Sequence, residues 1–203
     1  MKVKLLHNTP LEVADIAISK CYDKEPYKDV TKQQSRINRV ANVSKHSSTI
    51  EHLVYSFDID GISRAVLQEL ARHRIASYTV KSTRYTLKEL VKASLNWEEY
   101  NGDADKFLVR TGNIDIDEQN LNTLRDLRDW VGIYPNDVVK YMLPEAYKTA
   151  LVMTINARAL QNFLALRTDS HALWEIQDLA RAMYDVIPNE HRFLFEEAVK
   201  PES

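Results

Sequence analysis

The sequence has little of what builds several common kinds of site. Its one cysteine, Cys21, excludes an internal disulfide and a thiolate metal cluster, and we interpret it as packing on an apolar helix face. The four glycines form neither a GxGxxG nor a Walker A pattern, so a nucleotide would have to be held by side chains. A GxSxG nucleophile motif is absent too, as is any apolar run near the ~18 residues that a membrane span needs.

Composition and charge narrow the class of protein further. The N-terminus lacks the apolar core of a signal peptide, so we expect a cytoplasmic protein with no membrane partner. The formal net charge of −2 argues against general binding of nucleic acid, so any polyanion site must be local. The 203 residues contain no repeat, low-complexity tract or linker, so residues 1–203 are expected to form one domain.

Hydrophobic periodicity predicts several helices and a few strands. Leu53, Tyr55, Phe57 and Ile59 alternate with polar neighbours, which predicts a strand with one buried face that ends at Gly61. The same reasoning predicts strands near 3–5 and 151–155, and helices near 9–21, 31–45, 65–71, 121–131, 156–167 and 170–187. Because strands do not alternate regularly with helices, we predict an α+β fold: a small, mainly antiparallel sheet flanked by helices.

Several polar residues are predicted to cap helices. Thr9 precedes Pro10, Asn156 precedes an apolar-periodic run, and Ser170 precedes the last long helix. Ser48 and Glu51 have the spacing of a capping box.

A basic stretch, RHRIASYTVKSTRY at residues 72–85, contains no acidic residue. Its cations are Arg72, His73, Arg74, Lys81 and Arg84. Cations at a helix C-terminus offset the dipole by ~0.3–1 kcal/mol each, which accounts for Arg72 but not for Lys81 or Arg84. Guanidinium groups beside hydroxyl side chains suit a phosphate dianion, so a phosphate site and a charged helix end both remain open.

Two further stretches carry polar residues of interest. In KHSSTIEH, residues 45–52, His46 and His52 lack the i, i+4 spacing of a zinc helix, so no metal site is expected. In residues 156–177, Asn156 and Asn162 fall within a helical pattern, where asparagine is unfavourable. This segment is either an amphipathic helix with a solvated face or a ligand-binding one.

Taken in order, the three stretches resemble the flavin-dependent thymidylate synthases. The signature of that family is Arg-His-Arg, seven residues and then Ser, which here is Arg72-His73-Arg74 followed by Ser82. The resemblance also covers the His…Glu-His element upstream and the Asn-Ala-Arg element downstream. It implies conversion of dUMP to dTMP with methylenetetrahydrofolate as carbon donor and with FAD, reduced by NADPH, as hydride carrier. It further implies a homotetramer whose active sites lie between subunits.

The resemblance assigns roles to individual residues. Residues implied for dUMP are Glu69, Arg72, Val80, Lys81, Ser82, Thr83, Arg84, Lys140 and Arg167. Residues implied for FAD are His46, Ser48, Arg72, His73, Arg74, Val80, Asn156, Ala157, Arg158, Asn162 and His171. Arg167 is implied as the catalytic residue, because it would stabilise negative charge on the uracil ring without a cysteine nucleophile.

The sequence departs from the family pattern at three of these positions. Lys140 replaces an arginine, Val80 replaces the usual glutamate, and Glu69 replaces the usual glutamine. Two other functions remain open: a phospholigand- or RNA-binding module that uses residues 72–85 only for charge, and a flavoenzyme that methylates uracil in tRNA.

Overall fold

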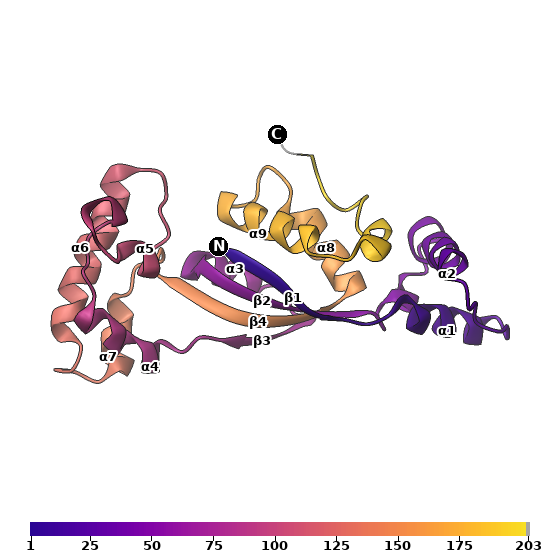
Figure 1. Cartoon of the computed structure of the whole chain (residues 1–203), viewed down its shortest axis with the longest axis horizontal. Coiled ribbons are helices and arrows are strands. Elements are labelled where there is room, and N and C mark those ends of the chain that lie inside the picture. Colours follow the sequence, from indigo (N-terminus) through magenta and orange to yellow (C-terminus); the bar gives the residue numbers. More distant parts are fainter. Residues whose placement is uncertain (202–203) are drawn as a thin grey trace. The chain divides into compact units, whose positions relative to one another are not determined.

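The computed structural model describes residues 1–201 and divides the chain into two compact units (Figure 1). Unit 1 comprises residues 1–59, 71–79 and the described part of 152–203, whereas unit 2 comprises residues 60–70 and 80–151. The chain passes between the units within three of its strands and once directly after a helix. Each unit has its own buried residues and is described separately.

Unit 1 contains most of a small, mainly antiparallel sheet with strand order β1-β2-β4-β3. The strands are β1 (Lys2–Asn8), β2 (Val54–Ser63), β3 (Ala76–Val80) and β4 (Lys148–Asn156). Tyr55, Phe57 and Ile59 of β2 are fully buried, as their alternation predicted. The combination of helices with a small antiparallel sheet confirms the α+β prediction.

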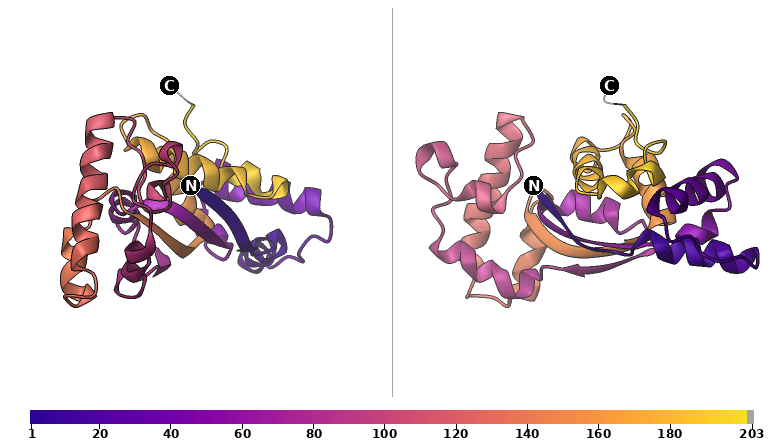
Figure 2. Two further views of the ribbon diagram at one scale, coloured as in Figure 1. Left: turned by 60° about the vertical axis from the view of Figure 1, so that its left-hand side comes forward. Right: turned by 45° about the vertical axis from the view of Figure 1, so that its right-hand side comes forward.

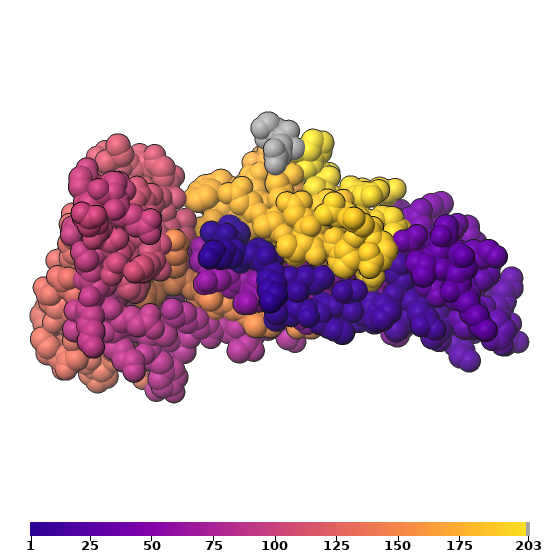
Figure 3. Space-filling model, in the orientation of Figure 1, coloured from indigo at the N-terminus to yellow at the C-terminus, as the bar shows by residue number. Residues whose placement is uncertain are grey.

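Four longer helices belong to unit 1: α1 (Leu11–Cys21), α2 (Val30–Ile37), α8 (Ala157–Arg167) and α9 (Trp174–Asp185). Helices α8 and α9 contact each other and lie on the same face of the sheet (Figures 1 and 2). Helix α9 also contacts β1, and Figure 3 shows the yellow C-terminal segment against the indigo first strand. Leu160, Phe163 and Leu164 form the buried face of α8, which leaves the opposite face for polar residues.

A buried ion pair joins α1 to α2. The Asp15 carboxylate is fully buried and accepts the Nε–H of Arg36 at 2.6 Å and the backbone N–H of Tyr27 at 2.7 Å. Arg36 also donates to the Ser19 hydroxyl at 2.8 Å, and its guanidinium lies 4.1 Å from the centre of the Tyr27 ring. Because both charges have several partners, they are compensated although they are out of water.

His191 is buried near the start of β2 and beside β1. One ring nitrogen, Nδ1, lies 2.7 Å from the Tyr55 hydroxyl, and Nε2 lies 3.4 Å from Nδ2 of Asn8. Burial lowers the pKa of His191 from its usual value, an effect that the carboxylate of Glu190 opposes. The folded protein therefore favours the neutral imidazole.

We expect the pH dependence of stability to include a contribution from His191. Below about pH 6.5 the unfolded chain binds a proton at this histidine that the folded chain takes up only at lower pH, so stability is full above that pH and falls as pH decreases. Urea unfolding between pH 7.5 and 5 measures the effect. His191→Gln should flatten this dependence, whereas His7→Gln, at an exposed histidine, should not. An unchanged slope in His191→Gln would reject the assignment.

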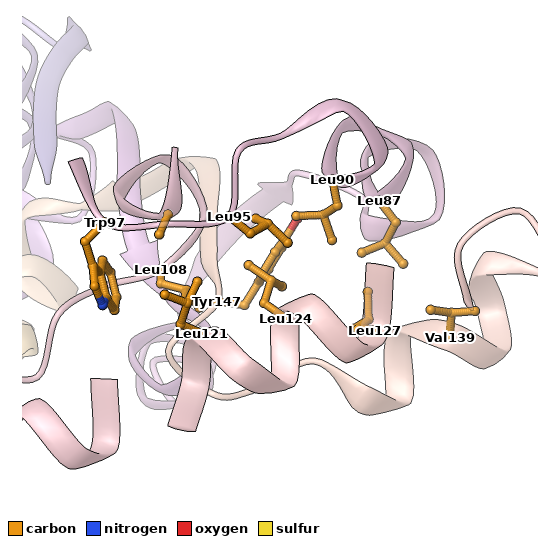
Figure 4. Close-up of a cluster of buried hydrophobic side chains, with 11 residues drawn as sticks. Leu87, Leu90, Leu95, Trp97, Leu108, Leu121, Leu124, Leu127, Val139 and Tyr147 are labelled. Atoms are coloured by element: carbon orange, nitrogen blue, oxygen red, sulfur yellow. The ribbon is translucent and has the colours of Figure 1, made fainter. Parts of the chain in front are cut away.

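Unit 2 is helical apart from the strand ends that enter it. Its helices are α3 (Arg64–Leu70), α4 (Thr83–Thr86), α5 (Ala104–Phe107), α6 (Ile114–Trp130) and α7 (Asn136–Val139). Leu121, Leu124 and Leu127 of α6 point into a hydrophobic cluster that includes Leu90 and Tyr147 (Figure 4). These leucines are the ones whose spacing predicted the helix. No helix within residues 1–201 is both long and apolar enough to cross a membrane.

Several local predictions are wrong. Thr9 does not cap α1; its hydroxyl accepts the backbone N–H of Val54 at 3.1 Å and donates to the Val54 carbonyl at 3.4 Å. Gly61 does not end β2 but continues it with a φ of +79°. Cys21, the last residue of α1, is exposed rather than packed.

Candidate functional site

The three stretches singled out in the sequence meet at one cavity in unit 1, with a volume of about 990 Å³. The stretch 45–52 contributes Glu51, and the basic stretch 72–85 contributes residues 72–75. The stretch 156–177 contributes the exposed face of α8 and the turn that follows it. The lining residues are Glu51, Arg72, His73, Arg74, Ile75, Asn156, Arg158, Ala159, Asn162, Ala165, Leu166, Arg167, Asp169, His171 and Ala172.

The start of α8 places two of the polar residues in the cavity wall. Asn156 has extended backbone angles, and its side-chain oxygen accepts the N–H of Ala159 at 2.8 Å, so it caps the helix as predicted. Arg158 and Asn162 are four residues apart and therefore lie on the same face of the helix. This face of α8 lines the cavity, and the buried residues of the helix lie on its opposite face.

An ion pair links the stretch 45–52 to α8. Nη1 of Arg158 donates to Oε1 of Glu51 at 2.5 Å. The predicted capping box of Ser48 and Glu51 is therefore wrong: His46 is the N-cap of the short 3₁₀ turn Ser47–Ile50, and Glu51 follows its last residue. Glu51 lines the cavity, although its spacing in the sequence predicted only a capping role.

Arg167 lies in the last turn of α8 beside His73. Its Nε–H donates to Nε2 of His73 at 3.0 Å, which requires that this imidazole nitrogen carries no proton. The His73 ring contacts Phe163 edge to face, with ring centres 4.9 Å apart. Tyr78 donates its hydroxyl hydrogen to the His73 carbonyl at 2.9 Å. His73 is thus held from two sides and orients the guanidinium of Arg167.

The turn after α8 is organised by a carboxylate. Asp169 accepts the backbone N–H of His171 at 3.0 Å and lies 2.8 Å from Nδ1 of the same residue. The backbone hydrogen bond and the imidazole hold the pKa of Asp169 below its usual value. This turn explains why the last helix begins at Trp174 and not at Ser170 as predicted.

The cavity is positively charged. Four arginines, Arg72, Arg74, Arg158 and Arg167, face two carboxylates, Glu51 and Asp169, in its lining. Arginine presents several N–H groups in a planar fork that matches phosphate oxygens. The arrangement therefore suits a large anionic ligand with amide-binding groups, because two asparagines stand among the cations.

Comparisons with known proteins identify the family. The Thy1 family, described as thymidylate synthase complementing protein, matches residues 4–191. A flavin-dependent thymidylate synthase of Wolinella succinogenes is 50% identical over 200 residues, covering 96% of this chain and 97% of the relative. One from Helicobacter pylori strain 26695 is 47% identical over 207 residues, covering 98% of this chain and all of the relative.

This chain belongs to the flavin-dependent thymidylate synthases. A solved structure of the same family supports the assignment at the level of the fold. The crystal structure of the flavin-dependent thymidylate synthase from Helicobacter pylori, complexed with FAD and dUMP, matches with a TM-score of 0.92 and 46% sequence identity. The match covers 98% of this chain and all of that one.

The residues that the family resemblance implies for dUMP divide between the two units. Arg72 and Arg167 line the cavity of unit 1. Those in unit 2 are Glu69, Val80, Lys81, Ser82, Thr83, Arg84 and Lys140. Arg84 is held by α7, because its Nε lies 2.8 Å from the Asp137 carboxylate and its carbonyl accepts Nδ2 of Asn136 at 2.6 Å. Lys140 follows α7 directly.

Some residues that family likeness implies for FAD lie outside the cavity wall. Among the described residues, the lining includes neither His46 nor Ser48, although the turn that bears Ser48 contacts α8. Ala157 is fully buried, and its N–H donates to the Leu53 carbonyl at 2.8 Å. The roles of these residues and of Val80 stay predictions of the family resemblance.

Proposed function

We propose that this flavin-dependent thymidylate synthase binds FAD in the cavity of unit 1 and converts dUMP to dTMP. The observation that carries the proposal is the meeting of three separate sequence stretches at one arginine-lined cavity. Methylenetetrahydrofolate is the proposed carbon donor and NADPH the proposed reductant. We propose the whole chain, residues 1–203, as one functional domain.

The residues of the cavity fit FAD. A volume of about 990 Å³ is at the upper end of ligand pockets, which are typically ~300–1,000 Å³, and suits a dinucleotide. Arg74 and Arg158 offer N–H donors to a diphosphate, and Asn156 and Asn162 offer amide groups to a heterocycle. When bound, FAD supplies the hydride that the methyl transfer requires. The chain itself supplies binding, orientation and charge.

Arg167 is the proposed activating residue. Carbon C5 of uracil becomes nucleophilic only if negative charge develops on the ring, and Cys21, the single cysteine of the sequence, is not among the residues that line the cavity. A guanidinium held in a fixed orientation stabilises such charge without reorganising during the reaction. The hydrogen bond to His73 fixes Arg167 in this way. His73 therefore serves as a positioning residue for Arg167.

The phosphate of dUMP is assigned to the basic stretch and to Lys140. Ser82 and Thr83 begin α4 and offer hydroxyl donors, while Lys81 and Arg84 of the same unit offer positive charge. Lys81 lies 3.7 Å from the Glu89 carboxylate and Arg84 is paired with Asp137, so the phosphate has to compete with these carboxylates. Lys140 preserves the charge of the usual arginine but not its bidentate geometry.

A homotetramer is part of the proposal, with active sites between subunits. Unit 2 has large apolar side chains in contact with solvent, among which Tyr141 is 85% exposed, Ile114 80% and Ile133 67%. Covering such side chains in an assembly would remove apolar area from water. Size-exclusion chromatography with light scattering measures the oligomeric state.

We expect purified protein to carry FAD or to take it up. The test is incubation with excess FAD, removal of free flavin by gel filtration, and measurement of the flavin absorbance of the protein fraction. A yellow protein with a stoichiometric amount of flavin is the expected result. Protein that stays colourless would reject the proposal, and colourless protein that retains nucleic acid would support the RNA-binding alternative.

A further inference from the structure

We propose that Glu51 is a positioning residue for the cofactor. Its carboxylate holds the Arg158 guanidinium at the cavity wall, in the orientation that receives an anionic group of FAD. This inference rests on the proposed function of the cavity, and it assigns a role to a carboxylate in a site that otherwise attracts anions.

The geometry leaves part of Arg158 available to a ligand. Only Nη1 donates to Glu51, and within residues 1–201 neither Nε nor Nη2 of Arg158 has a hydrogen-bond partner. The guanidinium is planar, so one short bond at Nη1 restricts the direction of its other N–H groups. Arg158 is the second residue of α8, and the face of the helix from which it projects lines the cavity.

Glu51 comes from a part of the chain that is well fixed. It follows the turn Ser47–Ile50, whose Thr49 and Ile50 are buried and which contacts α8. The N–H of Glu51 donates to the Ser48 carbonyl at 3.2 Å. A long arginine side chain has many rotamers, and fixing them on binding lowers affinity. Glu51 restricts Arg158 before the ligand arrives.

The ion pair between Arg158 and Glu51 contributes too little to the stability of the fold for stability to explain its presence. The side chains of Arg158 and Glu51 are 57% and 43% exposed, and ion pairs this exposed contribute little to folding. A carboxylate near a bound diphosphate would by itself weaken binding through repulsion. The charge of Glu51 opposes binding of an anion, so a loss of FAD affinity that disappears in the Arg158→Ala background identifies an effect exerted through Arg158.

The test is a double-mutant cycle on FAD affinity, measured by quenching of flavin fluorescence in the purified chain. Glu51→Ala should weaken FAD binding about 3- to 10-fold, the range expected for one rotamer-rich side chain that loses its orientation. Glu51→Gln keeps an acceptor for Nη1 and should restore part of the affinity. In the Arg158→Ala background, Glu51→Ala should not weaken binding further and should tighten it slightly, because only the repulsion between the carboxylate and the diphosphate is then removed.

Glu197→Gln serves as the matched control. Glu197 forms an exposed ion pair with Lys45 at 3.6 Å outside the cavity lining, so this variant should bind FAD like the wild type. Equal or tighter binding by both Glu51 variants, or additive losses in the cycle, would overturn the inference while leaving the proposed function in place. A wild-type protein that binds no FAD would instead overturn the proposed function, and this inference with it.

Discussion

Replacing Arg167 by alanine is expected to reduce the exchange of the C5 hydrogen of dUMP by about 10²- to 10³-fold, the loss typical of removing one fixed donor to a developing negative charge. The variant should still bind FAD, because Arg74 and Arg158 remain. Release of tritium from [5-³H]dUMP measures the exchange, and bound flavin is measured in parallel.

Two further variants make the result specific. Arg167→Lys keeps a positive charge but not the Nε–H that donates to His73, so it should recover only part of the rate. Arg39→Ala, at an exposed arginine outside the cavity lining, should exchange like the wild type. Wild-type exchange by Arg167→Ala would mean that another group activates the uracil ring.

Removal of one member of the buried pair between α1 and α2 should have the largest effect on stability. Arg36→Ala leaves the Asp15 carboxylate, which is fully buried, without its cation, and breaking a buried pair costs about 3–5 kcal/mol. The free energy of unfolding, measured by urea denaturation and circular dichroism at fixed protein concentration, should fall by this amount.

The double variant Asp15→Leu/Arg36→Met distinguishes the effect of losing one charge of the pair from the effect of losing side-chain volume. Because it removes both charges and retains apolar volume, its loss should be smaller than that of Arg36→Ala. The control Glu197→Gln breaks an exposed pair and should change stability by less than about 1 kcal/mol. A loss below about 1 kcal/mol in Arg36→Ala would show that water or another group compensates Asp15.

The elements that could be predicted from sequence are those whose pattern reflects burial. Tyr55, Phe57 and Ile59 alternate because one face of β2 is covered, and Leu121 and Leu124 repeat because one face of α6 is. Such patterns reflect local geometry together with the presence of a core, so they do not depend on which distant residue supplies the contact.

The predictions that failed concern polar groups with a choice of partner. Thr9 was expected to cap a helix, but it bonds to the backbone of Val54. Glu51 was expected in a capping box, but it pairs with Arg158, which lies 107 positions away. A hydroxyl or carboxylate bonds to whichever donor the tertiary fold brings near, and no local spacing encodes that donor.

For the site itself, the kind of ligand could be predicted better from the sequence than the spatial arrangement of the residues that line the cavity. The excess of cations at residues 72–85 suited a phosphate ligand as well as a charged helix end, and the asparagines of residues 156–177 suited a ligand-binding helix as well as a solvated one; the family resemblance favoured the ligand in both cases. The sequence could not show that these stretches share a cavity with Glu51, nor that His73 accepts a hydrogen bond from Arg167. Both facts depend on packing between segments far apart in the chain.

Formation of dTMP tests the central claim most directly. The purified chain is incubated with dUMP, methylenetetrahydrofolate, FAD and NADPH, and the product is separated and quantified by chromatography. We predict dTMP in the complete mixture, none when methylenetetrahydrofolate is omitted or when protein freed of its flavin is used without added FAD, and a rate reduced about 10²- to 10³-fold in Arg167→Ala. Protein that binds FAD and dUMP but forms no dTMP in the complete mixture would contradict the account.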